Sequence, residues 1–145
     1  MAFYETGKIA EDLQKLLEDS KLFADVKVAA ITSYKHLFSI IPGLAKFPVA
    51  IVCIGYGSFN SDRTSRTVNP GIVIVDKFKS TAERSAISIW DVLDKTGNLF
   101  YSEQGPRKGL KINGARYWTE SFRPLALDGK CAAYLLELKA VSINN

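Results

Sequence analysis

The sequence predicts a mixed α/β (α+β) fold in which one mixed or mostly antiparallel sheet is flanked by two to three helices. Two apolar runs, Phe47–Ile54 and Gly71–Phe78, are rich in β-branched residues and are bounded by glycine or proline. Two other stretches, near residues 6–20 and 80–97, repeat apolar residues at helical spacing. Strand runs and one-sided helices together indicate helices that pack on a sheet.

The chain has 145 residues, of which 47% are hydrophobic and 23% charged. These values are typical of a folded protein, and the length suits one domain covering residues 1–145. No apolar run approaches the roughly 20 residues that a membrane helix needs. The N-terminus lacks the basic and apolar regions of a signal peptide. We therefore expect synthesis in the cytoplasm and no membrane partner.

The first helix is predicted to begin at Thr6, as its cap, and to end near Asp19-Ser20. Its apolar face contains Ile9, Leu13, Leu16 and Leu17. Leu22–Val28 then alternates apolar and charged residues, which predicts a strand with one wet face near a sheet edge. A short helix from Ser33 to Pro42-Gly43 follows.

Phe47–Ile54 carries no charge, which predicts a strand buried on both faces near the middle of the sheet. Its expected partner is Gly71–Phe78. The polar segment between them, Gly55–Pro70, shows no periodicity and predicts a long loop at the tip of an antiparallel hairpin.

The second helix opens with a capping box, Ser80-Thr-Ala-Glu83, and Gly97 is its expected terminator. Its predicted apolar stripe consists of Ala82, Ala86, Ile89, Trp90 and Leu93. A second long loop, Gly97–Gly114, comes next. Two further strands are predicted at Ala115–Phe122 and Cys131–Val141, although the alanines and leucines of the latter also suit a helix.

No motif dictates a reaction, so no enzyme activity, cofactor or metal site is predicted. Gly55-Tyr-Gly-Ser-Phe-Asn60 resembles the start of a dinucleotide fingerprint but lacks its third glycine and the helix that should follow. The only histidine, His36, is expected at the surface. Cys53 and Cys131 are expected to be buried free thiols, and a disulfide would require that their strands be neighbours.

The net charge is +4, a modest basic excess. A nucleic-acid-binding alternative rests on the segment Arg107–Trp118, which mixes cations with aromatic residues in the way that single strands are held. Its members are Arg107, Lys108, Lys111, Arg116, Tyr117 and Trp118. A basic loop is more often only solvated, so direct nucleic-acid binding stays open but is not expected.

The order of these elements, with phrases such as Phe23–Val28 and Phe47–Val52, resembles the tail terminator and minor tail proteins of tailed bacteriophages. The resemblance covers nearly the whole chain but includes no chemical signature. It implies a structural virion protein of the tail or neck, in a ring of commonly six copies that caps the tail tube and joins it to the head connector. A head-to-tail connector or neck protein is the nearest alternative.

Under this resemblance the two long loops would contact ring neighbours, the tube or the connector, because loops on a rigid scaffold often carry binding. The candidate interaction residues in these loops are Tyr56, Phe59, Arg63, Arg66, Arg107, Lys108 and Lys111.

Overall fold

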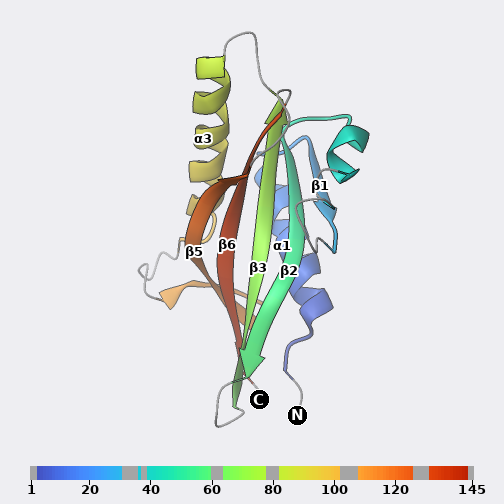
Figure 1. Ribbon diagram of the computed structural model, residues 1–145. Coiled ribbons are helices and arrows are strands. Elements are labelled where there is room, and N and C mark those ends of the chain that lie inside the picture. The colour runs from blue at the N-terminus through green and yellow to red at the C-terminus, as the bar shows by residue number, and fades with distance from the viewer. Residues whose placement is uncertain are drawn as a thin grey trace.

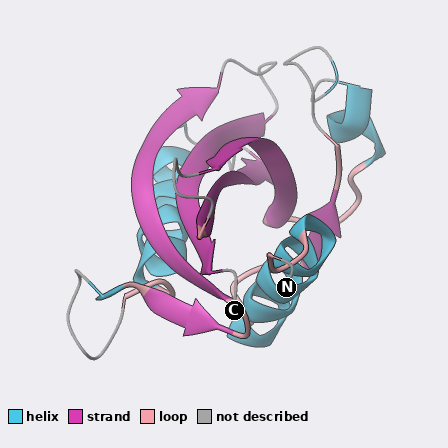
Figure 2. Ribbon diagram, turned by 90° about the horizontal axis from the view of Figure 1, so that it is seen from below, coloured by secondary structure: helices cyan, strands magenta, loops and turns pink. Residues whose placement is uncertain are grey.

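A computed structural model of the chain shows one curled, mixed six-stranded sheet with its two long helices on the outer side (Figures 1 and 2). The structure describes residues 3–30, 36, 39–59, 64–77, 82–101, 108–125 and 131–143. The helices are α1 (Thr6–Ser20), the short 3-10 helix η1 (Ile41–Gly43) and α3 (Ala82–Asn98). The strands are β1 (Asp25–Val28), β2 (Val49–Phe59), β3 (Ser65–Lys77), β4 (Leu110–Ile112), β5 (Ala115–Leu125) and β6 (Cys131–Ile143).

The strand order across the sheet is β1-β2-β3-β6-β5-β4. β1 runs parallel to β2, and every other neighbouring pair is antiparallel. The predicted antiparallel hairpin of β2 and β3 is therefore confirmed, as is the position of β1 at an edge. β2 lies next to that edge, whereas the middle of the sheet is formed by β3 and β6.

The sheet has a core on each face. On the helix side, α1 and α3 cover residues such as Ala50, Val52, Ile72 and Leu138. The inner side holds a smaller cluster that includes Val49 and Ile51 together with residues of η1. Since β2 contributes fully buried residues to both clusters, the prediction that this strand is buried on both faces is confirmed.

Helix α1 ends at Ser20, as predicted. Lys21 takes the left-handed conformation (φ 61°), and its N–H donates to the Glu18 carbonyl, which satisfies one of the last free carbonyls of the helix. The predicted cap at Thr6 is wrong. Glu5 occupies the capping position, and it makes no side-chain capping hydrogen bond.

Most of the predicted loop Gly55–Pro70 is strand. β2 continues to Phe59 and β3 begins at Ser65, so only residues 60–64 separate them. The backbone ladder continues there without a clear apolar pattern, because only Val68 and Pro70 are buried among the described side chains of this end. Gly57 permits the close approach, since a Cβ at this position would lie 2.6 Å from the Thr67 carbonyl oxygen.

The second predicted loop, Gly97–Gly114, also contains unexpected structure. α3 continues past Gly97 to Asn98, and β4 follows at Leu110–Ile112. A strand of three residues is too short to show an alternating pattern, which explains why the sequence did not reveal it. The Ser80–Glu83 capping box lies outside the described side chains. None of the helices in the described part of the chain is long and apolar enough to cross a membrane.

The last two strands confirm the strand reading of both segments. β6 extends from Cys131 to Ile143, and Leu136, Leu138 and Ala140 point into the helix-side core. Both cysteines are free, and the strands that carry them are separated by β3. A disulfide between neighbouring strands is therefore excluded by the topology.

Candidate interaction surface

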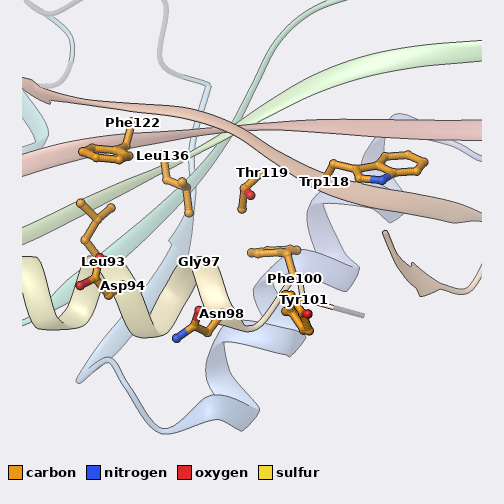
Figure 3. A pocket seen from close by; sticks show the side chains of 10 residues that line it. All are labelled: Leu93, Asp94, Gly97, Asn98, Phe100, Tyr101, Trp118, Thr119, Phe122 and Leu136. Atoms are coloured by element: carbon orange, nitrogen blue, oxygen red, sulfur yellow. The ribbon is translucent and has the colours of Figure 1, made fainter. Parts of the chain in front are cut away.

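A groove of about 680 Å³ lies between helix α3 and strand β5 (Figure 3). We call it the aromatic groove. The residues that line it are Leu93, Asp94, Gly97, Asn98, Phe100, Tyr101, Trp118, Thr119, Phe122 and Leu136. Its floor is rigid, because Leu93, Phe100 and Leu136 belong to the helix-side core. Asp94 and Asn98 of α3 add polar groups.

Several aromatic side chains at this groove remain open to solvent. Phe122 is 63% exposed and Tyr101 62%; Trp90 of α3, which does not line the groove, is 49% exposed. Trp90 was predicted to lie in the apolar stripe of α3, and that part of the stripe is wrong, although Ile89 and Leu93 are buried as expected. Large apolar side chains that gather on a surface are typical of sites that another molecule covers.

The exposed aromatic side chains are held in place by contacts between elements. The ring of Phe122 lies 6.4 Å from the ring of Tyr134 on the adjacent strand. Trp90 Nε1 on α3 donates a 2.7 Å hydrogen bond to the Tyr134 hydroxyl. Preorganised aromatic rings lose little conformational entropy when a partner covers them, which suits them to recognition.

A second exposed aromatic residue cluster lies at the far end of the hairpin. Phe59 is 63% exposed, and its ring lies 5.4 Å from that of Phe3. Arg66, the direct partner of Phe59 across β2 and β3, places its guanidinium 5.7 Å from the Phe3 ring centroid and donates a hydrogen bond to the Tyr4 carbonyl. Arg66 therefore fastens the N-terminal segment to the sheet, whereas the sequence had suggested a free loop contact.

Tyr4 continues this attachment. Its hydroxyl donates a 2.5 Å hydrogen bond to Asp12 of α1, and the Asn113 side chain donates to the same carboxylate at 2.9 Å. Burial, followed by the hydrogen bond to Asp12, raises the pKa of Tyr4. The Tyr4 ring lies so close to Gly114 that a Cβ there would come within 2.5 Å of it.

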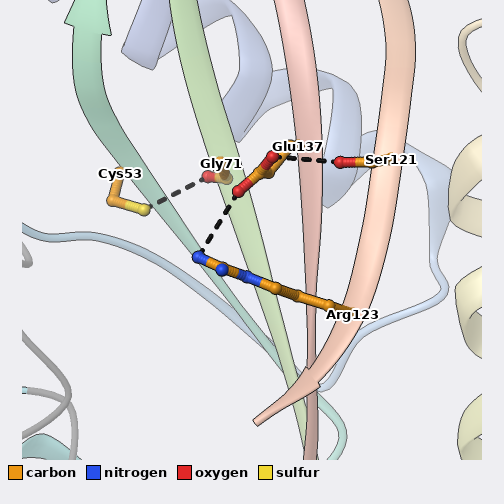
Figure 4. A network of polar contacts seen from close by, with 5 residues as sticks. All are labelled: Cys53, Gly71, Ser121, Arg123 and Glu137. Atoms are coloured by element: carbon orange, nitrogen blue, oxygen red, sulfur yellow. Dashed lines mark hydrogen bonds and ion pairs between the residues drawn. The ribbon is translucent and has the colours of Figure 1, made fainter.

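The inner face of the sheet carries a small polar network (Figure 4). Glu137 pairs with Arg123 at 3.5 Å and accepts a 3.0 Å hydrogen bond from Ser121. Cys53 donates from Sγ to the Gly71 carbonyl at 3.5 Å. Burial raises the pKa of the Cys53 thiol, so this group lacks the lowered pKa that a reactive cysteine needs.

In the described part of the basic and aromatic segment, Tyr117 lies in the core whereas Trp118 lines the aromatic groove. Tyr117 is fully buried in the core, where desolvation raises its pKa. Arg116 donates to the Lys108 carbonyl at 3.1 Å, and Trp118 lies against Gly109. Among the described cations named for this role, Lys108 and Lys111 are exposed and Arg116 is partly exposed.

The structure separates the candidate interaction residues into three groups. Phe59, Arg66 and Lys111 lie in strands, and Lys108 lies two residues before β4. Tyr56 belongs to β2, but its side chain lies outside the described part. Arg63 and Arg107 also lie outside the described residues. The aromatic groove was missed because it forms where α3 meets β5, a contact that no local pattern encodes.

Within the described residues, no group of three or more histidine, cysteine or acidic residues could hold a metal ion. His36 is partly buried, and its carbonyl accepts a hydrogen bond from Ser39. No protein-family model matches the chain, and no curated protein matches it.

Proposed function

We propose that this chain is a structural protein of a tailed bacteriophage virion, a tail terminator whose copies form a ring that caps the tail tube and joins it to the head connector. Six is the expected number of copies. The copies act by contact, so neither a cofactor nor a reaction is needed.

The observation that carries the proposal is the position of the exposed apolar side chains. Val28, Phe59, Trp90, Tyr101 and Phe122 are the large hydrophobic residues that are exposed in the described chain. Three of them lie on β1, β2 or β5, which are the strands nearest the two edges of the sheet. A subunit with apolar side chains at two separate edges can bind a neighbour on each side, as a ring requires.

The order of elements supplies further support. The resemblance rests on an amphipathic helix, a short strand, a short helix, two strands joined by a long polar loop, a second amphipathic helix, a second long loop and a closing strand. The described helices and strands follow this order, although most of the first loop and part of the second are strand. A neck or connector protein built from similar small subunits remains the nearest alternative, because it would need the same kind of lateral contact.

The first test is the mass of the purified protein by light scattering across a concentration range, with negative-stain images of any large species. A closed ring that forms without nucleic acid is the expected result. A monomer that instead shifts labelled single-stranded DNA, with a steep dependence on salt, would overturn the proposal in favour of a nucleic-acid-binding module.

A further inference from the structure

Each edge of the sheet has a step, where a short edge strand covers only part of the longer strand next to it. The two steps are at opposite ends of the sheet. At one edge, β1 covers only the first part of β2, from Val49 to Val52. At the other edge, β4 covers only the first part of β5, from Ala115 to Tyr117. In the described chain, no strand pairs with the outer side of β2 beyond Val52 or of β5 beyond Tyr117.

The two open stretches lie at opposite ends of the strands. The register aligns Val49 of β2 with Leu125 of β5 through Val75 and Ala133. In the same way, Phe59 aligns with Ala115 at the other end of the sheet. β1 therefore lies at the same level along the strands as the open end of β5, but at the opposite edge of the sheet. In the same way, β4 lies at the level of the open end of β2 (Figure 1).

These steps are complementary. β1 has four residues and β4 has three, whereas β2 and β5 have eleven each. When two copies meet edge to edge, the β4 of the first copy and the β1 of the second can thus lie end to end as one row. This row is flanked by β5 of the first copy and by β2 of the second. Strand directions also agree, because β1 is parallel to β2 and β5 runs opposite to β2.

The exposed side chains fall on matching rows of this arrangement. Val28, which is 48% exposed, shares a row across the sheet with Phe122 through Val52, Ile72 and Leu136. Both point to the helix side, since their strand partners Val52 and Leu136 belong to that core. Continuing the sheet into a second copy at the same level would therefore place Val28 of that copy opposite Phe122.

The other step behaves in the same way. Phe59 shares its row with Ile112 of β4 through Arg66, Ser142 and Ala115. Ile112 is a partly buried hydrophobic residue of the helix-side core. A neighbouring Phe59 would thus meet an apolar side chain and not a charge.

We propose that a second copy of this chain docks head to tail by interlocking the steps. β1 of the incoming copy pairs with the open part of β5, in which Pro124 has no N–H to donate, and its β2 pairs with β4. Val28 of that copy covers Phe122, and its helix α1 comes to lie beside α3 over the aromatic groove. This inference deepens the proposed ring and rests on it for the identity of the partner. Because the contact joins two different surfaces, its repetition gives a ring or a filament and not a closed dimer.

The test is disulfide cross-linking of the double variant Val28→Cys with Phe122→Cys. Directly opposed residues on adjacent strands have Cα atoms roughly 4.5–5.5 Å apart, which suits a disulfide. Mild oxidation should give a ladder of covalent oligomers on a denaturing gel. The matched control is Val28→Cys with Ser121→Cys, which keeps the same strand but moves one thiol to the inner face, and it should give no ladder.

The outcomes separate this inference from the proposed ring. A ladder from the double variant supports the interlocked edges, even if images show open filaments that contradict a terminator ring. Closed rings without a ladder would overturn the interlocked edges and leave the ring intact. A dimer from Phe122→Cys alone would also overturn the inference, because it would show that β5 pairs with β5. Absence of any cross-link at all protein concentrations overturns it as well.

Discussion

Replacing Phe122 by alanine should weaken self-association far more than it weakens the fold. A phenylalanine buries on the order of 200 Å² when it is covered completely. Because 63% of Phe122 is exposed in the single chain, about 125 Å² remains for a partner to cover. At about 25 cal/mol per Å², this area contributes about 3 kcal/mol to each contact, or roughly a 150-fold change in its association constant.

The assay is light scattering of the wild type and of Phe122→Ala over a dilution series. The concentration at which half of the protein is assembled should rise by about two orders of magnitude in the variant. Arg123→Ala is the matched control, because Arg123 lies next to Phe122 on β5 and its side chain is 56% exposed, but it points to the inner face, where it pairs with Glu137. Thermal unfolding at low concentration would show that both variants keep the fold. An unchanged dissociation curve for Phe122→Ala, with the wild type assembled, would refute the reasoning.

Three further predictions concern the single chain. Leu13 is a fully buried residue of α1, and Leu13→Ala should lower the free energy of unfolding by about 2–5 kcal/mol in urea titrations. Leu16 is only partly buried, so Leu16→Ala should lower it by less. Tyr117→Phe should be neutral or stabilising, because the buried Tyr117 hydroxyl has no hydrogen-bond partner in the described structure. Because the pKa values of Tyr4 and Tyr117 are raised, the folded state keeps their protons above pH 10 while the unfolded state releases them. The free energy of unfolding should therefore fall as the pH rises beyond about 10. It should fall less steeply in Tyr117→Phe, which has one titrating tyrosine fewer. Cys53 should react slowly with iodoacetamide at pH 8 in the folded protein and rapidly after denaturation, since burial raises its thiol pKa; equal rates would contradict its placement.

The buried strands and the amphipathic helices could be predicted because their patterns are local. α1 repeats apolar residues along one face, and three of them, Ile9, Leu13 and Leu17, are fully buried. The uncharged run in β2 likewise indicated burial on both faces. In each case a single element carries its own signal, which the packing then uses.

The strand ends could not be predicted, because backbone pairing holds them together and only Val68 and Pro70 are buried among their described side chains. Gly55–Phe59 and Ser65–Pro70 lack alternation, yet they extend β2 and β3 as a paired ladder. A polar segment rich in glycine reads as a loop when its partner strand is unknown. The same limit hid β4, whose three residues pair with β5.

The interaction surface was harder still to predict, because it depends on strand order. Phe122 and Tyr134 become neighbours only because β5 pairs with β6, and Trp90 reaches them from α3. In the sequence, Trp90 fits the apolar stripe of its helix, and nothing local shows that it lies half exposed. Candidate residues chosen from loops therefore missed the groove and selected Arg66, which serves to hold the N-terminal segment.

The open part of β2 gives an independent reason to expect a specific neighbour. Ile54–Phe59 contains no charged residue and no proline, two of the devices that protect an edge strand from uncontrolled pairing, and only a register shift between Ile54 and Gly57 interrupts it. Gly55, Gly57, Ser58 and Phe59 are all exposed. Such an edge is a liability unless something restricts what can pair with it. The step formed by β1 supplies that restriction, because a long flat strand that approaches β2 would meet β1 after about half of its length. Only a partner with the opposite step can pair with both β1 and the open part of β2. The β4–β5 edge of a second copy has this shape, because its short strand lies at the other end.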